Sequence, residues 1–264
     1  TIDSGSIGFR VTESGGSTEV SESGTTDTFS VVLDARPLTD VVLTVVSGDA
    51  GEATVDVGTL TFTMANWNTP QTVTVTGIDD DVDDADQTPT ITVAVDDDNS
   101  NDSFDAVADQ TVSVTTTDDD TAGFVITESD GDTVVDESGT TDTFTVVLTS
   151  EPLGVVALEV SSGDTGEASV DTATLTFTPS NWGTVQTVTV TGVDDVTVDG
   201  SQSTTITVSV DDGSSDDAFD PVANQTVSVT TTDDDVAAFT IVESSGSTSV
   251  AESGTTDTFT VVLD

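Results

Sequence analysis

The sequence predicts an all-β protein built from tandem immunoglobulin-like antiparallel β-sandwiches, with about seven strands in each sandwich. Three observations lead to this fold class. The chain of 264 residues contains a long internal repeat, and apolar residues alternate with polar ones inside each repeat. No stretch carries the 3.6-residue apolar period of an amphipathic helix. We therefore expect a series of similar β domains.

The internal repeat has a period of 115 residues. The string ESGTTDTF begins at Glu22, Glu137 and Glu252, and 137 − 22 = 252 − 137 = 115. The string QTVTVTG begins at Gln71 and again, at the same offset, at Gln186. A unit of this length is an independent domain rather than a solenoid turn of about 20–45 residues. The predicted parts are an N-terminal junction (1–7), a first sandwich (8–120), a second sandwich (121–235) and the first two strands of a third, incomplete repeat (236–264).

Short runs with a period of two predict half-buried strands within each unit. Phe29, Val31 and Leu33 alternate with residues that tolerate water. Thr fills many outward positions, as suits a β-branched residue on a solvated sheet face. Turn residues such as those at 47–49 separate the runs. Further strands of the first unit are expected at 41–45, 60–62, 73–75, 91–95 and 112–114.

The two ends of the chain differ from the interior of the repeat. Residues 1–8 align with 116–123, so Asp3-Ser4-Gly5 stands where the interior junction has three Asp residues. The chain starts at Thr1 without a cleavable signal peptide, which leads us to expect a mature product or an internal piece. Two strands cannot bury a core alone. Residues 237–264 are therefore expected either to be part of a longer repeat array or to complete a neighbouring subunit.

The composition excludes several classes of protein. The chain has 51 Asp or Glu and 2 Lys or Arg, a formal charge of −49. Nucleic acid and anionic membrane surfaces are excluded as partners because binding them needs clustered Lys and Arg. Cys, His, Tyr and Lys are absent, which removes thiol and Ser-His catalysis, Schiff bases, the usual zinc sites and disulfides. The Asp164-Thr165-Gly166 string imitates an aspartic protease but follows no apolar strand. We expect no enzyme.

Acidic residues gather at particular loop positions of the unit. Runs stand at 79–81, 96–98 and 118–120, and related runs recur in the second unit. Two carboxylates about 4 Å apart repel by about 4 kcal/mol at an effective dielectric of 20. Two Arg residues cannot relieve several such clusters at one end of a sandwich. The pattern predicts bound cations, and Ca²⁺ fits best because it accepts six to eight oxygens at flexible angles. The alternative is a solvated, salt-adapted acidic surface without specific sites.

The order and spacing of several motifs resemble the Calx-beta domain. These are Val20-Ser21-Glu22-Ser23, the GTLTF string at 58–62, the strand that ends Gly77-Ile78-Asp79-Asp80-Asp81, and the closing triplet Asp118-Asp119-Asp120. This family is the calcium-binding sandwich of sodium/calcium exchangers and integrin β4, and it also forms repeats in bacterial surface proteins. The resemblance covers both full units, and the last 34 residues match the family's opening.

The resemblance implies a set of calcium ligands in each unit. The chain departs from the family pattern in two ways. Gln87 and Gln202 stand in place of an acidic ligand, and Val196 stands in place of an Asp. We therefore expect fewer ions per unit than in the fullest family sites, and fewer in unit two than in unit one. Glu252 matches the first ligand without its partners. The implied ligands are Glu22, Asp79, Asp80, Asp84, Asp118, Asp119 and Asp120 in the first unit, and Glu137, Asp194, Asp195, Asp199, Asp233, Asp234 and Asp235 in the second.

The resemblance also implies a function. A cation held between the mid-sheet loop, the first Glu and the closing triplet would lock the strand end that leads into the next domain. We therefore expect an extracellular calcium-binding repeat in a bacterial cell-surface adhesin, filament or matrix protein, acting as a calcium-rigidified spacer. Its expected partners are calcium ions and adjacent repeats or identical subunits. The alternatives are a self-assembling filament subunit, whose last strands complete a neighbour, and a salt-adapted surface protein.

Overall fold

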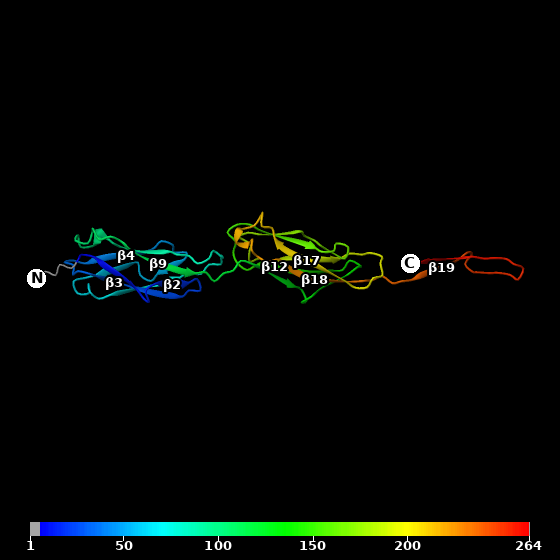
Figure 1. Ribbon diagram of the computed structural model, residues 1–264, viewed down its shortest axis with the longest axis horizontal. Coiled ribbons are helices and arrows are strands. Elements are labelled where there is room, and N and C mark those ends of the chain that lie inside the picture. Colours follow the sequence, from blue (N-terminus) through cyan, green and yellow to red (C-terminus); the bar gives the residue numbers. More distant parts are fainter. Residues whose placement is uncertain (1–5, 264) are drawn as a thin grey trace. The chain divides into compact units, whose positions relative to one another are not determined.

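A computed structural model describes residues 6–263, and its elements are β-strands and two short 3-10 helices (Figure 1). The predicted all-β class with several sheets is confirmed. Residues 1–5, which make up most of the predicted N-terminal junction, lie outside the described residues. Within the described part of the chain, no helix is long and apolar enough to span a membrane.

The chain divides into two compact units. Unit 1 takes in the chain up to Ala122 together with Thr149–Leu153, and unit 2 takes in Gly123–Leu148 and the chain from Gly154 onward. The strands of unit 1 are β1 (Phe9–Glu13), β2 (Thr18–Ser21), β3 (Thr26–Leu33), β4 (Val41–Ser47), β5 (Ala53–Val55), β6 (Thr59–Phe62), β7 (Gln71–Gly77), β8 (Thr90–Val95) and β9 (Gln110–Thr117), with the 3-10 helix η1 (Asp97–Asn99).

Unit 1 is a sandwich of two sheets with the strand orders β1-β3-β7-β5 and β2-β9-β8-β4-β6. Alternate residues of the strands point inward, as the period of two requires. In β3, for example, Phe29, Val31 and Leu33 are buried. Trp67, which precedes β7, packs against this core and is partly buried.

Unit 2 repeats this architecture, with the sheet orders β10-β12-β16-β14 and β11-β18-β17-β13-β15. Its strands are β10 (Phe124–Glu128), β11 (Thr133–Asp136), β12 (Thr141–Leu148), β13 (Val156–Ser162), β14 (Ala168–Val170), β15 (Thr174–Phe177), β16 (Gln186–Gly192), β17 (Gln202–Val210) and β18 (Gln225–Thr232), with the 3-10 helix η2 (Asp217–Phe219). The last strands, β19 (Phe239–Glu243) and β20 (Phe259–Leu263), form a separate antiparallel pair.

Two details of the predicted sandwich are wrong. Each full unit has nine strands rather than about seven, because strands as short as β2 and β5 are too brief to show an alternation. The sheets are also not purely antiparallel, since β2 runs parallel to β9 with Thr18 opposite Val114. The chain passes from β1 to β2, and so from one sheet to the other, through Gly15 and Gly16, whose φ angles of 72° and 94° favour glycine.

Candidate metal centre

The parallel pairing of β2 with β9 positions the first element of the site. Glu22 follows β2 directly, and its backbone N–H donates to the Thr117 carbonyl at 3.1 Å. Thr117 ends β9, and Asp118 comes next in the chain. The ladder therefore places Glu22 beside the predicted Asp triplet, although the two are far apart in sequence.

A glycine brings the second acidic segment to the same place. Gly77 ends β7 just before Asp79 and Asp80, and its backbone lies against β2. A Cβ at this position would be 2.1 Å from the Ser21 carbonyl oxygen, so no other residue fits without displacing the backbone. Gly192 stands equally close to the Asp136 carbonyl in unit 2. The close approach lets the loop after β7 begin next to Glu22.

Glu22 is the buried carboxylate of the site. The residue is 1% exposed, and its Oε2 atom has no hydrogen-bond partner. One oxygen each from Glu22, Asp118 and Asp120 lie within 4.8 Å of one another. Burial raises the pKa of Glu22 to about 7, with the negative charges of Asp118 and Asp80 adding to the shift. Burying a charge without a partner is costly, so this carboxylate requires either a proton or a cation.

A second group shares Glu22 with Glu52 and Asp84, again with one oxygen from each within 4.8 Å of the others. Glu52 lies in the turn before β5 and is held there because its carbonyl accepts from the Ile78 N–H at 2.9 Å. Both Glu52 Oε2 and Asp84 Oδ1 are buried atoms without a hydrogen-bond partner. Burial raises the pKa of Glu52 and of Asp84, and the charges of nearby carboxylates add to both shifts, while a hydrogen bond from Gln87 partly offsets the shift of Asp84.

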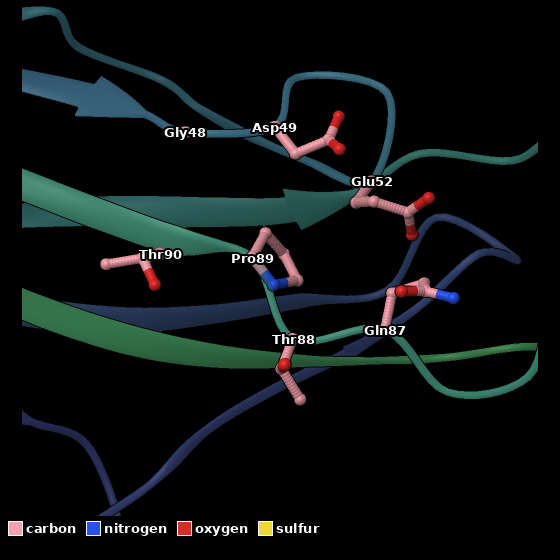
Figure 2. Close-up of a pocket in the computed structure, with 7 residues that line it drawn as sticks. All are labelled: Gly48, Asp49, Glu52, Gln87, Thr88, Pro89 and Thr90. Atoms are coloured by element: carbon pink, nitrogen blue, oxygen red, sulfur yellow. The ribbon is translucent and has the colours of Figure 1, made fainter.

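Glu52 also lines an open pocket of about 350 Å³ beside this group (Figure 2). In the view of Figure 2, the side chains of Asp49, Glu52 and Gln87 point toward the same side, away from Thr90. The Gln87 amide donates to the Asp84 carbonyl at 2.8 Å, which holds the loop that carries Asp84. The pocket therefore borders Glu52, a member of the second group.

The loop between β7 and β8 is fastened to the triplet by carboxylate hydrogen bonds. The Ala85 N–H donates to Asp118 Oδ2 at 2.7 Å, and the Asp118 N–H donates to Asp86 Oδ1 at 3.3 Å. Ala85 adopts a φ of 63°, a left-handed conformation that is unfavourable for a residue with a Cβ. The Asp120 N–H in turn donates to Asp118 Oδ1 at 2.8 Å. These bonds keep several carboxylates close together although they repel one another.

Unit 2 builds the same centre with one difference. Glu137 is 1% exposed, its Oε2 atom is unpartnered, and it forms a group with Asp233 and Asp235. Burial, followed by the charges of Asp233 and Asp195, raises the pKa of Glu137. Asp199, the counterpart of Asp84, is exposed here. Among the described residues, unit 2 therefore has one such group where unit 1 has two.

The cations of the chain do not compensate either centre. Arg10 pairs with Asp34 at 3.3 Å, and Arg36 donates to the Met64 carbonyl at 3.2 Å. The sequence holds no other Lys or Arg. The oxygen-only donor set, with buried atoms that lack partners, fits a hard cation such as Ca²⁺. An external cation can supply the missing positive charge.

The structure brings some of the predicted ligands together more closely than others. Glu22, Asp84, Asp118 and Asp120 belong to the groups of unit 1, and Glu137, Asp233 and Asp235 to that of unit 2. The remaining predicted ligands are exposed and lie outside these groups, although several raise the pKa of a group member by their charge. They are Asp79, Asp80, Asp119, Asp194, Asp195, Asp199 and Asp234.

Two acidic residues were not predicted. Glu52 and its counterpart Glu167 each carry a buried, unpartnered Oε2 atom. A usable signal was present, because the pattern SGDxGE stands at 47–52 and again at 162–167 with the repeat offset. The acidic run at 96–98, by contrast, lies apart from the closing triplet. Residues 96–98 follow the end of β8, whereas the triplet lies near its start, where Gln87 bridges Thr116.

The fold and these centres define a tandem β-sandwich protein with acidic clusters that could hold metal ions. No protein-family model and no curated protein matches the chain. Among solved structures, it resembles calcium binding domain CBD12 of CALX1.1, with 19% identity over 76% of this chain and 79% of that one and a TM-score of 0.32. The apo-form Calx CBD1 domain has 18% identity over 42% of this chain and 98% of that one, with a TM-score of 0.31.

Domains 4 and 5 of the S-layer protein SbsC are also similar to the chain. The identity is 16% over 85% of this chain and 97% of that one, and the TM-score is 0.34. Scores and identities this low are too weak to assign a site or a function. The case for a metal centre therefore rests on the geometry of the chain itself.

Proposed function

We propose that the chain is a calcium-binding repeat module of an extracellular or cell-surface structural protein, without enzymatic activity. One observation carries the proposal: a nearly fully buried glutamate with an unpartnered oxygen, at the same position in both units, facing aspartates and no cationic side chain. A carboxylate in that position is stable only if it is protonated or bound to a cation. The residues that would hold the ion are Glu22, Glu52, Asp84, Asp118 and Asp120 in unit 1, and Glu137, Asp233 and Asp235 in unit 2.

The ion would neutralise the repulsion within each centre and join separate segments of the unit. In unit 1 these are the end of β2, the turn before β5, the loop after β7 and the triplet after β9. The triplet is also the last part of the first repeat, since Phe124 opens the next one. Fixing the triplet would stiffen the connection that follows it, so that calcium would make the tandem repeat a firmer spacer.

The names of some similar structures agree with this proposal but do not support it by themselves. CBD12 of CALX1.1 is described as a calcium binding domain, and SbsC as a surface layer protein. A surface location for this chain, and a place in an adhesin, filament or matrix protein, are part of the proposal. The competing interpretation is an acidic, salt-adapted surface without specific cation sites.

Calorimetric titration of the whole chain with Ca²⁺ tests the proposal. We expect saturable binding, which Asp118→Asn weakens in unit 1 and Asp233→Asn weakens in unit 2. The control is Asp40→Asn, which changes an exposed aspartate outside both centres and should leave the titration unchanged. Equal stabilisation of the fold by calcium and by sodium, at equal ionic strength, would favour the salt-adapted alternative instead.

Spacer stiffening needs a second measurement. Small-angle scattering in EDTA and in millimolar Ca²⁺ reports the spread of distances within the chain. We expect a narrower, more rod-like distance distribution with calcium and no change in the Asp118→Asn variant. A scattering profile that is the same in both buffers would refute the spacer role. Calcium binding itself would then be decided by the titration alone.

A further inference from the structure

The strand that carries Glu22 is weakly held by its own ladder. β2 has four residues, lies at the edge of its sheet and, among the described strands, pairs only with β9. Parallel pairing of this kind is slightly less stable per residue than antiparallel pairing. The Glu22 carboxylate adds a repulsive force, because it is buried beside the charges of Asp118 and Asp80. Without further support, the end of β2 would fray and release Glu22 to solvent.

Two side chains from the turn after β2 occupy its free edge. Backbone N–H groups of successive strand residues point to opposite edges, and the Glu22 N–H donates to the last residue of β9. On the opposite edge, the Ser21 N–H donates to Thr25 Oγ1 at 2.7 Å. Two residues earlier, the Glu19 N–H donates to Asp27 Oδ2 at 3.1 Å. The two oxygens stand where a neighbouring strand would present carbonyl groups.

Asp27 is itself fixed by other hydrogen bonds. Its Oδ1 atom accepts from the Ser14 hydroxyl and from the Thr28 N–H. The bond from Ser14, followed by the bond from the Glu19 N–H, holds the pKa of Asp27 below its ordinary value. Both carboxylate oxygens are engaged, and among the described residues Asp27 belongs to neither acidic group of unit 1. Asp27 therefore acts on β2 and is not a candidate ligand.

Thr25 joins the end of β2 to the end of β7. Its carbonyl accepts from the Gly77 N–H at 3.1 Å, while its hydroxyl holds the Ser21 N–H. Gly77 is also the residue that packs closely on Ser21. The loop that carries Asp84 begins directly after Gly77. A single threonine therefore fixes two segments of the metal centre relative to each other.

The same two bonds occur in every copy of the ESGTTDTF string. In unit 2, Thr140 Oγ1 and Asp142 Oδ2 accept from two N–H groups of β11 at 2.7 and 2.9 Å. In the third copy, Thr255 and Asp257 accept from the equivalent N–H groups, each at 2.9 Å. Residues 248–251 form no strand there, so the bonds do not depend on the parallel ladder. They are a local property of the string.

We propose that Thr25 and Asp27 are positioning residues that hold Glu22 in the metal centre by taking the place of a neighbouring strand on the free edge of β2. Thr140 and Asp142 do the same in unit 2. Neither pair touches the ion. They keep the glutamate in place against the repulsion of the aspartates before a cation arrives, and such preorganisation raises affinity. The part of this inference that concerns metal rests on the proposed function.

Calcium titration of the whole chain tests the role of Asp27. Every variant also carries Asp233→Asn, so that the tighter binding reports unit 1. We expect Asp27→Ala to weaken this binding at least about tenfold, as the loss of a hydrogen bond to an ionised group predicts. Asp27→Asn removes the same charge but keeps an acceptor for the Glu19 N–H, so its affinity should stay within about threefold of the parent. Equal weakening by both variants would overturn the inference, because it would show that Asp27 acts through its charge alone.

Thr25→Val tests the second positioning residue. Valine keeps the branched shape and removes the acceptor for the Ser21 N–H, so calcium binding should weaken at least about threefold. Thr26→Val is the matched control, because Thr26 is exposed and its hydroxyl makes no hydrogen bond within the described part of the chain. Calcium binding that is equally tight in the two variants would overturn the role of Thr25.

Amide hydrogen exchange in EDTA separates positioning from a general loss of stability. Asp27→Ala should speed the exchange of the Glu22 N–H at least about tenfold and leave the slow amides of β4 and β8 unchanged. The comparison variant is Val41→Ala, which leaves a cavity in the core on β4, three strands away from β2. It should speed exchange throughout unit 1 and leave the calcium affinity of the folded chain unchanged. Uniform acceleration by Asp27→Ala would overturn the inference by showing a merely structural role.

The proposed function fails in a different way. A parent chain without saturable calcium binding would refute the metal centre itself. The exchange of the Glu22 N–H in EDTA needs no metal, so it supports or overturns the positioning of Glu22 independently of that result.

Discussion

The substitution Glu22→Gln should stabilise unit 1 in the absence of calcium and should reduce the additional stability that calcium provides. Glutamine keeps the shape of the side chain and removes its charge. Without metal at pH 8, the Glu22 carboxylate must ionise in the folded state, where its pKa is raised from 4.5 to about 7. Such a shift corresponds to about 3 kcal/mol of lost stability, because each tenfold change in a proton equilibrium is worth about 1.4 kcal/mol.

The variant should recover part of this energy in EDTA. The glutamine amide is buried with incomplete hydrogen bonding, which offsets about 1–2 kcal/mol. We expect a net stabilisation of about 1–2 kcal/mol, or a rise of about 4–8 °C in the Tm of unit 1. In saturating calcium, the loss of one ligand weakens binding at least about tenfold and removes about 1.4 kcal/mol of calcium-dependent stability. The stabilisation by calcium should therefore shrink.

Differential scanning calorimetry at pH 8, in EDTA and in millimolar Ca²⁺, measures both effects. The control is Glu19→Gln, because Glu19 lies three residues earlier on an exposed part of β2 and contacts only Ser17 through its carboxylate at 3.0 Å. It should shift stability by less than about 0.5 kcal/mol in both buffers. A Glu22→Gln variant that melts earlier in EDTA, or that gains as much from calcium as the parent, would refute the electrostatic reasoning.

Three other perturbations test the architecture of the units. The metal-free chain should lose stability as pH rises from about 4.5 to about 7, because Glu22 binds a proton more tightly in the folded chain than in the unfolded chain. Excess calcium should remove this dependence of stability on pH. Thermal melts across the pH range measure both effects. Gly77→Ala should lower the free energy of unfolding of unit 1 by at least about 3 kcal/mol in urea unfolding, because the new Cβ would lie 2.1 Å from the Ser21 carbonyl oxygen. The control Gly58→Ala should be nearly neutral, because there is open space around Gly58. Ala85→Gly should stabilise unit 1 by about 1 kcal/mol in EDTA, because glycine adopts a φ of 63° without the strain that a Cβ causes. The reverse change at the equivalent position of unit 2, Gly200→Ala, should destabilise that unit by a similar amount. A fall in the melting temperature of both variants would contradict this expectation.

Much of the fold could be predicted from the sequence because its cause is local. The alternation at Phe29, Val31 and Leu33 decides which face of β3 enters the core, and the structure buries all three. Short strands such as β5, with three residues, were missed because they contain too few residues for an alternation. The parallel pairing of β2 was missed because it depends on a distant strand, with Thr18 opposite Val114 (114 − 18 = 96 residues apart), which no local pattern shows.

The site was predicted in part, for the same reason. The buried glutamates and the closing triplets carry a motif, and Glu22, Asp118 and Asp120 do come together. Glu52 was missed although its motif repeats, because one acidic residue in a turn looks like any solvated carboxylate. Only its position beside Glu22, with a buried and unpartnered oxygen, makes it a candidate ligand.

The sequence by itself determined the repetition of the fold, the β class and the shortage of positive charge, since 51 acidic residues face 2 basic ones. These properties follow from composition and from periods along the chain. The tertiary structure decided which carboxylates meet. The Glu22–Thr117 backbone bond and the close packing of Gly77 on Ser21 join three distant segments at one end of the sandwich. It also decided which carboxylates stay apart. The registers of the strand ladders set the distances between carboxylates, and those distances determine how strongly their charges repel.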